Sequence, residues 1–254
     1  PAIREFGDAR LVNVITTSVF VAMATWVAYR GMMTAKRVTY VLVSFQMAML
    51  LLWCAWGLQK PLAGGVPSAI PFEWNWRNPF AIESAAALAA GLSLSIFIYW
   101  GWDVSLSANE ETSGSEHTPA LAALASIVML AGTYLLVAIS TQMFAGTGET
   151  GIGLRADATL DNVFEALAVP IMGDGALEIL LFAAVLASAA SSLQTTFIPA
   201  ARTLLAMSVY KAMLDVLSEI HPVHRVPSKA TIVSGVLTAT FYAVMTLLSE
   251  NVLS

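Results

Sequence analysis

The chain has 254 residues, of which 57% are hydrophobic and 11% are charged, and its formal net charge at pH 7 is -5. Soluble domains carry about 25% charged residues, so this composition excludes a soluble globular domain, and the excess of apolar residues excludes a disordered chain. The acidic balance argues against a nucleic-acid partner, which would require a basic face. Cys54 is the single cysteine, so an intrachain disulfide is excluded. These limits leave a polytopic membrane protein.

Six apolar stretches are each long enough to cross about 30 Å of hydrocarbon as a helix. They do not alternate as the strands of a membrane barrel do, so helices are expected. The sequence therefore predicts an all-α polytopic membrane protein with six transmembrane helices. In chain order the six predicted spans are residues 11–29, 38–58, 82–106, 121–144, 177–206 and 231–248.

Two shorter stretches, residues 160–168 and 208–220, mix charged and apolar side chains at helical spacing. This pattern is typical of amphipathic helices that lie along a membrane surface. We expect both to be surface-lying connector helices rather than spans.

The positions of lysine and arginine predict the orientation of the chain. The first and fifth connectors lie on one side if the spans alternate, and together with Arg202 at the adjoining end of the fifth span they hold seven of the twelve basic residues. We therefore expect the first, third and fifth connectors to face the cytoplasm. The seven basic residues are Arg30, Lys36, Arg37, Arg202, Lys211, Arg225 and Lys229.

The third predicted span contains an anomaly near its middle. Gly101 lies between Trp100 and Trp102 and is followed at once by Asp103. A glycine weakens the helix there, and a charge inside a membrane is costly unless it lines a polar cavity. A discontinuous helix would expose carbonyls and amides that can bind a zwitterion or an ion. Alternatively, the tryptophans form an interfacial aromatic belt and the glycine only permits close packing.

The fifth predicted span carries small and hydroxylated residues. Ala184, Ser188 and Ser192 recur every four residues, so they would form one stripe that lets a neighbouring backbone approach. The second interpretation is a site for a sodium-sized cation or for a substrate, since hard cations prefer oxygen ligands such as the hydroxyls of Ser191, Ser192 and Thr195. Both interpretations stay open at this point.

Several motifs together resemble the amino acid-polyamine-organocation superfamily of permeases. Residues 99–103 and the pair Glu110 and Glu111 resemble the sixth helix of that family, in which a broken aromatic-glycine-aromatic-aspartate segment precedes two glutamates. Residues 29–38 resemble the link between its fourth and fifth helices. Residues 201–207, with 221–227 beyond them, resemble the end of its eighth helix and the loop into its ninth.

The resemblance implies a leucine-transporter-like fold of five-plus-five inverted repeats, with the third span of this chain broken in mid-membrane. The six spans would correspond to family helices four through nine. Residues 1–254 would then be one incomplete transporter domain that lacks the first three and the last helices, and this chain alone is not expected to transport.

By the same resemblance, the main-chain carbonyls of Phe97, Ile98 and Tyr99 would receive the ammonium group of a substrate. Trp100 or Trp102 would shape and close the binding pocket around Gly101 and Asp103, and Glu110 and Glu111 would act as a gate or as loop anchors. Independently of the resemblance, the hydroxyl-bearing residues Ser188, Ser191, Ser192 and Thr195 are the candidates for an ion site or a second site. Some relatives carry a lysine in the fifth helix that takes the place of sodium. The corresponding span of this chain, residues 38–58, contains no lysine, so that proton-coupled variant is not supported.

The resulting hypothesis is a secondary active transporter that moves amino acids or related amines across the plasma (inner) membrane by alternating access. Its partners would be the substrate, the lipid bilayer and a coupled proton or sodium ion, with no cofactor and no nucleic acid. An intramembrane enzyme is disfavoured because His117, His221 and His224 all fall in connectors. An ion or solute channel built from broken helices is the remaining alternative.

Overall fold

The computed structural model describes residues 10–78, 82, 84–99 and 117–248, and all the regular structure in this part of the chain is helical. The chain divides into two compact units. The first unit comprises residues 1–46 and 184–254, and the second comprises residues 47–183. Each unit is described below by itself.

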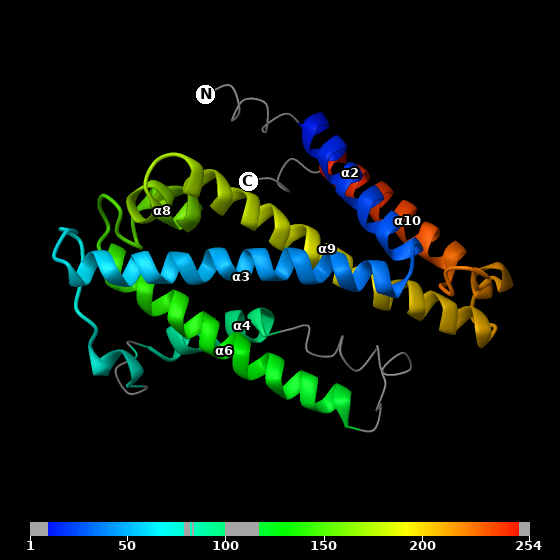
Figure 1. Cartoon of the computed structure of the whole chain (residues 1–254), viewed down its shortest axis with the longest axis horizontal. Helices are drawn as coiled ribbons and strands as arrows, with labels where there is room; N and C mark the ends of the chain where they lie inside the picture. The colour runs from blue at the N-terminus through cyan, green and yellow to red at the C-terminus, as the bar shows by residue number, and fades with distance from the viewer. Residues whose placement is uncertain (1–9, 79–81, 83, 100–116, 249–254) are drawn as a thin grey trace. The chain divides into compact units, whose positions relative to one another are not determined.

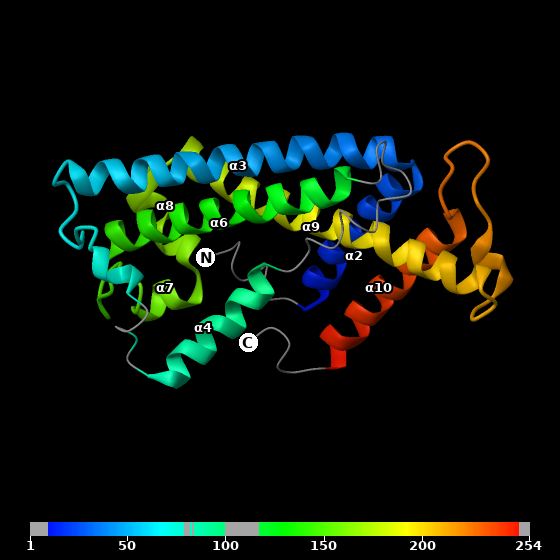
Figure 2. The same ribbon diagram turned by 90° about the horizontal axis from the view of Figure 1, so that it is seen from below.

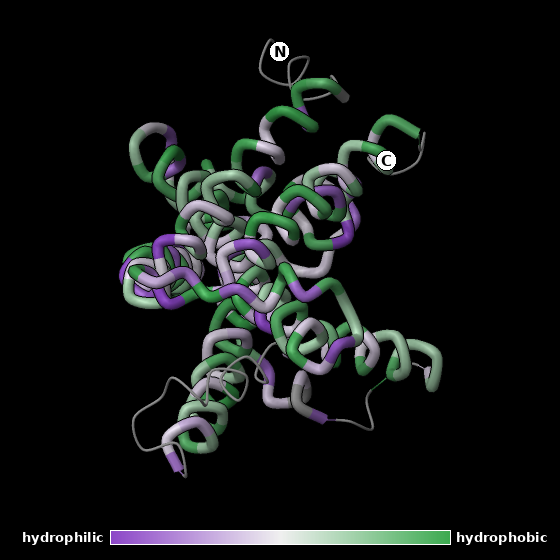
Figure 3. Tube along the Cα trace, turned by 90° about the vertical axis from the view of Figure 1, so that its right-hand side faces the viewer, coloured by the Kyte–Doolittle hydropathy of each residue, from purple (hydrophilic) through white to green (hydrophobic). Residues whose placement is uncertain are grey.

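Five helices are long and apolar enough to cross a membrane, counting the described residues only. They confirm five of the six predicted spans and make the chain a multi-pass membrane protein. Hydrophobic residues cover much of their turns (Figure 3), as expected where the surroundings are lipid. The five helices are α2 (Arg10–Tyr29), α3 (Met32–Leu62), α6 (Thr118–Ala145), α9 (Ala176–Val209) and α10 (Ser228–Leu248).

The third predicted span is described only in part. Its helix, α4 (Ala85–Ile98), begins after Ser84, whose hydroxyl oxygen accepts a hydrogen bond from the Ala87 N–H at 3.1 Å. The 14 residues of α4 rise roughly 21 Å, which is short of the hydrocarbon thickness. Residues 83 and 100–106 of the predicted span lie outside the described residues, so the sixth span and its break stay predictions.

In the first unit, α2 packs against α10 (Figure 1). A Cβ atom added to Gly235 would overlap the side chain of Thr25, so glycine at this position permits the close approach of the two helices. Behind this contact, Val21 and Ala24 form a small buried core with Phe197 of α9.

In the second unit, Trp53 anchors α3 to its neighbours. Its side chain is fully buried, and its indole N–H donates to the Thr141 hydroxyl of α6 at 3.0 Å. Its ring also meets Phe164 edge-on, with 5.2 Å between the ring centroids. Gly57, one helical turn further along α3, lies directly against Ser140. A buried indole needs a partner for its N–H, and Thr141 supplies it.

The stretch predicted as the first connector helix is helical, as α7 (Asp157–Asp161) and α8 (Val163–Met172), both visible in Figure 2. Leu167, Ala168 and Ile171 are fully buried, however. The ammonium group of Lys60 also donates to the Pro170 carbonyl at 2.8 Å. Helix α8 is thus a connector helix rather than one of the five spans, as predicted, but one side of it packs within the second unit, and its position along a membrane surface stays a prediction.

The second predicted connector helix, residues 208–220, does not form. Helix α9 ends at Val209, and Lys211 takes a left-handed conformation with φ of 62°. The N–H groups of Lys211 and Ala212 then bond to the carbonyls of Ser208 and Met207, as in a Schellman motif. That motif ends a helix, so the prediction of a continuous helix here is wrong.

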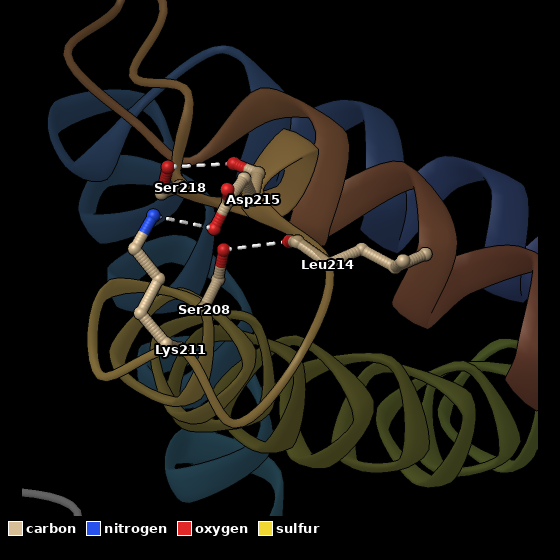
Figure 4. A network of polar contacts seen from close by, with 5 residues as sticks. All are labelled: Ser208, Lys211, Leu214, Asp215 and Ser218. Atoms are coloured by element: carbon tan, nitrogen blue, oxygen red, sulfur yellow. Dashed lines mark hydrogen bonds and ion pairs between the residues drawn. The ribbon is translucent and has the colours of Figure 1, made fainter.

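Polar side chains stabilise the turn that follows (Figure 4). The Ser208 hydroxyl donates to the Leu214 carbonyl at 2.7 Å, and Lys211 pairs with Asp215 at 2.8 Å. A short 3-10 helix, η4 (Asp215–Ser218), completes the segment. The charged residues that suggested an amphipathic helix thus serve a local turn instead.

Candidate functional site

The candidate substrate site begins where α4 ends. Ile98 is the last residue of the helix, and Tyr99 follows with φ of -87° and ψ of 1°, outside the usual helical values. The Tyr99 N–H still bonds to the Ser95 carbonyl at 3.0 Å. The last carbonyls of a helix lie at the end of its regular hydrogen-bond pattern, where they can accept from side chains or ligands.

A tyrosine of α6 occupies one of these carbonyls. The hydroxyl of Tyr134 donates to the Ile98 carbonyl at 3.2 Å. The rings of Tyr134 and Tyr99 pack edge to face, with centroids 5.5 Å apart and an interplanar angle of 86°. These two contacts fix the end of α4 to α6 within the second unit. Sequence reasoning missed Tyr134, although it is the one tyrosine in the predicted span of residues 121–144.

The predicted substrate-site residues fall partly inside and partly outside the described part of the chain. Phe97, Ile98 and Tyr99 lie at the end of α4 as expected, and the Phe97 side chain is largely exposed. The remaining predicted positions lie outside the described residues and stay predictions. They are Trp100, Gly101, Trp102, Asp103, Glu110 and Glu111.

The predicted hydroxyl site on α9 is divided between two faces of the helix. Ser191 is buried and donates to the Ser188 carbonyl, whereas Ser192 is exposed and its carbonyl accepts from the Thr195 hydroxyl, both at 3.0 Å. The buried face of α9 in the first unit runs through Ala184, Ala187, Ser191 and Gln194. The predicted stripe of Ala184, Ser188 and Ser192 is therefore not the buried face, because successive positions on a helix are rotated by about 100°.

Gln194 is a residue that sequence reasoning missed. It is 2% exposed, and its amide nitrogen has no hydrogen-bond partner among the described residues. It lies one turn from Ser191 on the same buried face, so these two polar side chains, rather than Ser191 and Ser192, share a face of α9. The sequence feature that could have identified Gln194 is that it is the one amide side chain in the predicted span of residues 177–206.

No metal centre is apparent, since no group of three or more His, Cys, Asp or Glu side chains gathers in the described part of the chain. Hydroxyls, amides and helix-end carbonyls are among the polar groups of its apolar helices. Such groups can bind a small zwitterion or a hard cation.

Comparison with known proteins agrees with this arrangement of apolar helices and isolated polar groups. A family model described as "Amino acid permease" matches residues 2–254. No curated protein gives a significant match. The family model covers nearly the whole chain, so the chain belongs to the amino acid permease family, whose members are transporters of amino acids.

Proposed function

We propose that this chain is part of a secondary active transporter that moves amino acids or related amines across the plasma membrane by alternating access. The observation that carries the proposal is the end of α4 at Ile98, two residues before the start of the sequence Trp100-Gly101-Trp102-Asp103. A helix that stops inside an apolar segment can present backbone carbonyls to a ligand at membrane depth. Such an arrangement suits a site for the charged groups of an amino acid.

In this proposal the ammonium group of the substrate binds the carbonyls at residues 97–99. Backbone carbonyls carry two lone pairs, so the Ile98 carbonyl can accept from Tyr134 and from a substrate at the same time. Trp100 or Trp102 closes the pocket, Asp103 lines it, and Glu110 and Glu111 form the gate. The leucine-transporter-like arrangement of inverted repeats belongs to the same proposal.

The coupling ion is proposed separately. Ser188, Ser191, Ser192 and Thr195 are the candidate positions for a sodium site, because each supplies hydroxyl or carbonyl oxygen. Ser191 is the best placed of them, since it is buried and shares a face of α9 with Gln194. Proton coupling and exchange are the alternatives.

Uptake by the complete permease in proteoliposomes tests this function. We expect uptake of at least one member of an amino acid and amine panel to saturate, and preloaded substrate to accelerate entry of labelled substrate. An inward sodium gradient should stimulate uptake if the α9 hydroxyls bind sodium, whereas indifference to sodium removes that proposal and leaves proton coupling or exchange. Flux that neither saturates nor shows counterflow would favour a channel and contradict alternating access.

Tyr134→Phe tests whether the end of α4 is part of the site. The change keeps the ring that packs on Tyr99 but removes the hydrogen bond to the Ile98 carbonyl. A hydrogen bond of this kind contributes about 1 kcal/mol, so we expect the KM for uptake to rise about fivefold with similar folded yield. Tyr242→Phe in α10 is the matched control and should leave KM unchanged. Equal KM values for the two variants would show that Tyr134 does not position the site.

A further inference from the structure

A groove of about 410 Å³ follows the contact between α2 and α10 in the first unit. Its walls include Val21, Trp26 and Tyr29 of α2 and Ile232 and Val236 of α10. No charged side chain in the described part of the chain lines it. The Trp26 and Val236 side chains are 57% and 59% exposed. The groove is thus an open, apolar feature of a membrane-spanning helix pair.

The groove has a packed floor. Val21, which is 3% exposed, belongs to the core that includes Ala24 and Phe197. Gly235 lies against Thr25 at the helix contact itself. The groove is therefore a depression on the surface of well-packed helices and not a defect in their core.

The length of the groove matches one leaflet of a bilayer. Its lining on α2 runs from Ser18 to Tyr29, a rise of roughly 17 Å, and half of the hydrocarbon core is roughly 15 Å thick. A neighbouring transmembrane helix would contact the pair over a full span. A groove of half that length fits a lipid acyl chain better than it fits a helix.

Positive charge and aromatic rings gather at one end of the groove. The guanidinium group of Arg30 lies 5.1 Å from the centre of the Trp26 ring. Tyr29, at the same end, packs edge-on against His221 and His224, with centroids 5.4 and 5.6 Å away. Tryptophan and tyrosine favour the level of the lipid headgroups, and arginine attracts anionic headgroups there.

We propose that the groove between α2 and α10 is a binding site for one anionic phospholipid, with an acyl chain along Val21, Ile232 and Val236 and the phosphate beside Arg30. This is the side that the lysine and arginine distribution predicts to be cytoplasmic, and anionic lipids are concentrated in that leaflet. The lining of the groove includes none of the residues proposed for the substrate or the ion, so the proposal stands independently of the transport mechanism.

Lipid binding to the complete permease tests the site. The protein is purified, stripped of lipid in detergent, and titrated with phosphatidylglycerol or with phosphatidylcholine of the same acyl chains, and bound lipid is counted by native mass spectrometry. One basic residue near the surface favours an anionic lipid by about fivefold in affinity. We therefore expect one phosphatidylglycerol to bind about fivefold more tightly than phosphatidylcholine.

Two substitutions separate the acyl chain from the headgroup. Val236→Trp fills the groove and should weaken both lipids, whereas Leu237→Trp is the matched control, since Leu237 is also 59% exposed but does not line the groove. Arg30→Gln should lower phosphatidylglycerol affinity to that of phosphatidylcholine, and Arg30→Lys should largely retain the preference. If Val236→Trp fails to fold, the comparison of Arg30→Gln with Arg30→Lys still tests whether Arg30 binds the headgroup.

Three results would overturn the proposal. Equal affinity of the unmodified protein for the two lipids would show that the site does not recognise an anionic headgroup. Equal lipid binding by Val236→Trp and Leu237→Trp would place the lipid elsewhere. Loss of an oligomer in Val236→Trp, without loss of bound lipid, would show that a second copy of the chain occupies the groove.

Discussion

Replacing Gly146 by alanine is expected to destabilise the permease by more than about 2 kcal/mol. Gly146 follows the last residue of α6 with φ of 69° and ψ of -178°, a region that only glycine adopts readily and that costs other residues about 1 to 3 kcal/mol. An added Cβ atom would also lie 2.6 Å from the Ser68 carbonyl oxygen. Because that neighbour is backbone, it can move only if the connector moves with it.

The connector that Gly146 contacts, residues 68–70, caps the C-terminal end of α6. The Ser68 hydroxyl donates to the Phe144 carbonyl at 3.2 Å, and the Ile70 N–H donates to the Met143 carbonyl at 3.0 Å. These are carbonyls of the last helical turn, which have no partner within the helix. Displacing residues 68–70 would therefore leave polar groups of α6 unsatisfied, which adds to the cost of the strained backbone.

Thermal unfolding of the purified permease in detergent measures this effect. We expect Gly146→Ala to lower Tm by about 4 °C or more. Gly132→Ala is the matched control, because Gly132 lies within α6 and no described atom lies within 4 Å of the Cβ it would gain. Alanine should be neutral or favourable there, since it is the better helix former. Equal Tm values for the two variants would refute the role assigned to Gly146.

The spans of this fold are readable from the sequence because membrane insertion demands long apolar helices. Five of the predicted spans agree with the described helices, although α3 continues beyond the predicted stretch through Lys60 to Leu62 and α9 continues to Val209. Hydropathy marks the part of a helix that lies in lipid, whereas backbone hydrogen bonds decide where the helix stops. The ends of α3 and α9 therefore lie outside what hydropathy predicts.

The error at residues 208–220 has a specific cause. Lys211 takes the left-handed position of a helix-ending motif that glycine usually occupies. A lysine gives no such signal in a sequence, and its charge instead suggests an amphipathic helix. Similarly, the packing of α8 depends on residues distant in sequence, since Phe164 meets Trp53 and the Pro170 carbonyl accepts from Lys60.

The candidate site was only partly predictable for the same reason. Gly101 and Asp103 are visible as breaches of the apolar pattern, and α4 does end just before them. Tyr134 becomes relevant only through its contact with Ile98, 36 residues away. On α9 the sequence shows the hydroxyls, but which of them share the buried face depends on how the helix is rotated against its neighbours.

Replacing Trp100 by alanine in the complete permease is expected to weaken substrate binding about tenfold. Trp100 comes directly after Tyr99, where the described helix end lies, and one residue before Gly101. We propose that it is the aromatic lid of the site, which stacks on the substrate and shields it from water. Loss of such a cation-π or apolar contact costs about 1 to 2 kcal/mol, which corresponds to the tenfold change.

Trp102→Ala provides the matched comparison, because residues two apart on a regular helix point to divergent faces. If Trp100 faces the substrate, Trp102 should pack against a neighbouring span, and its loss should lower the yield of folded protein while the affinity of the remainder stays unchanged. Binding of labelled substrate to purified protein, normalised to the folded fraction, measures both effects. The reverse behaviour of the two variants would assign the lid to Trp102, and unchanged affinity in both would show that neither tryptophan closes the site.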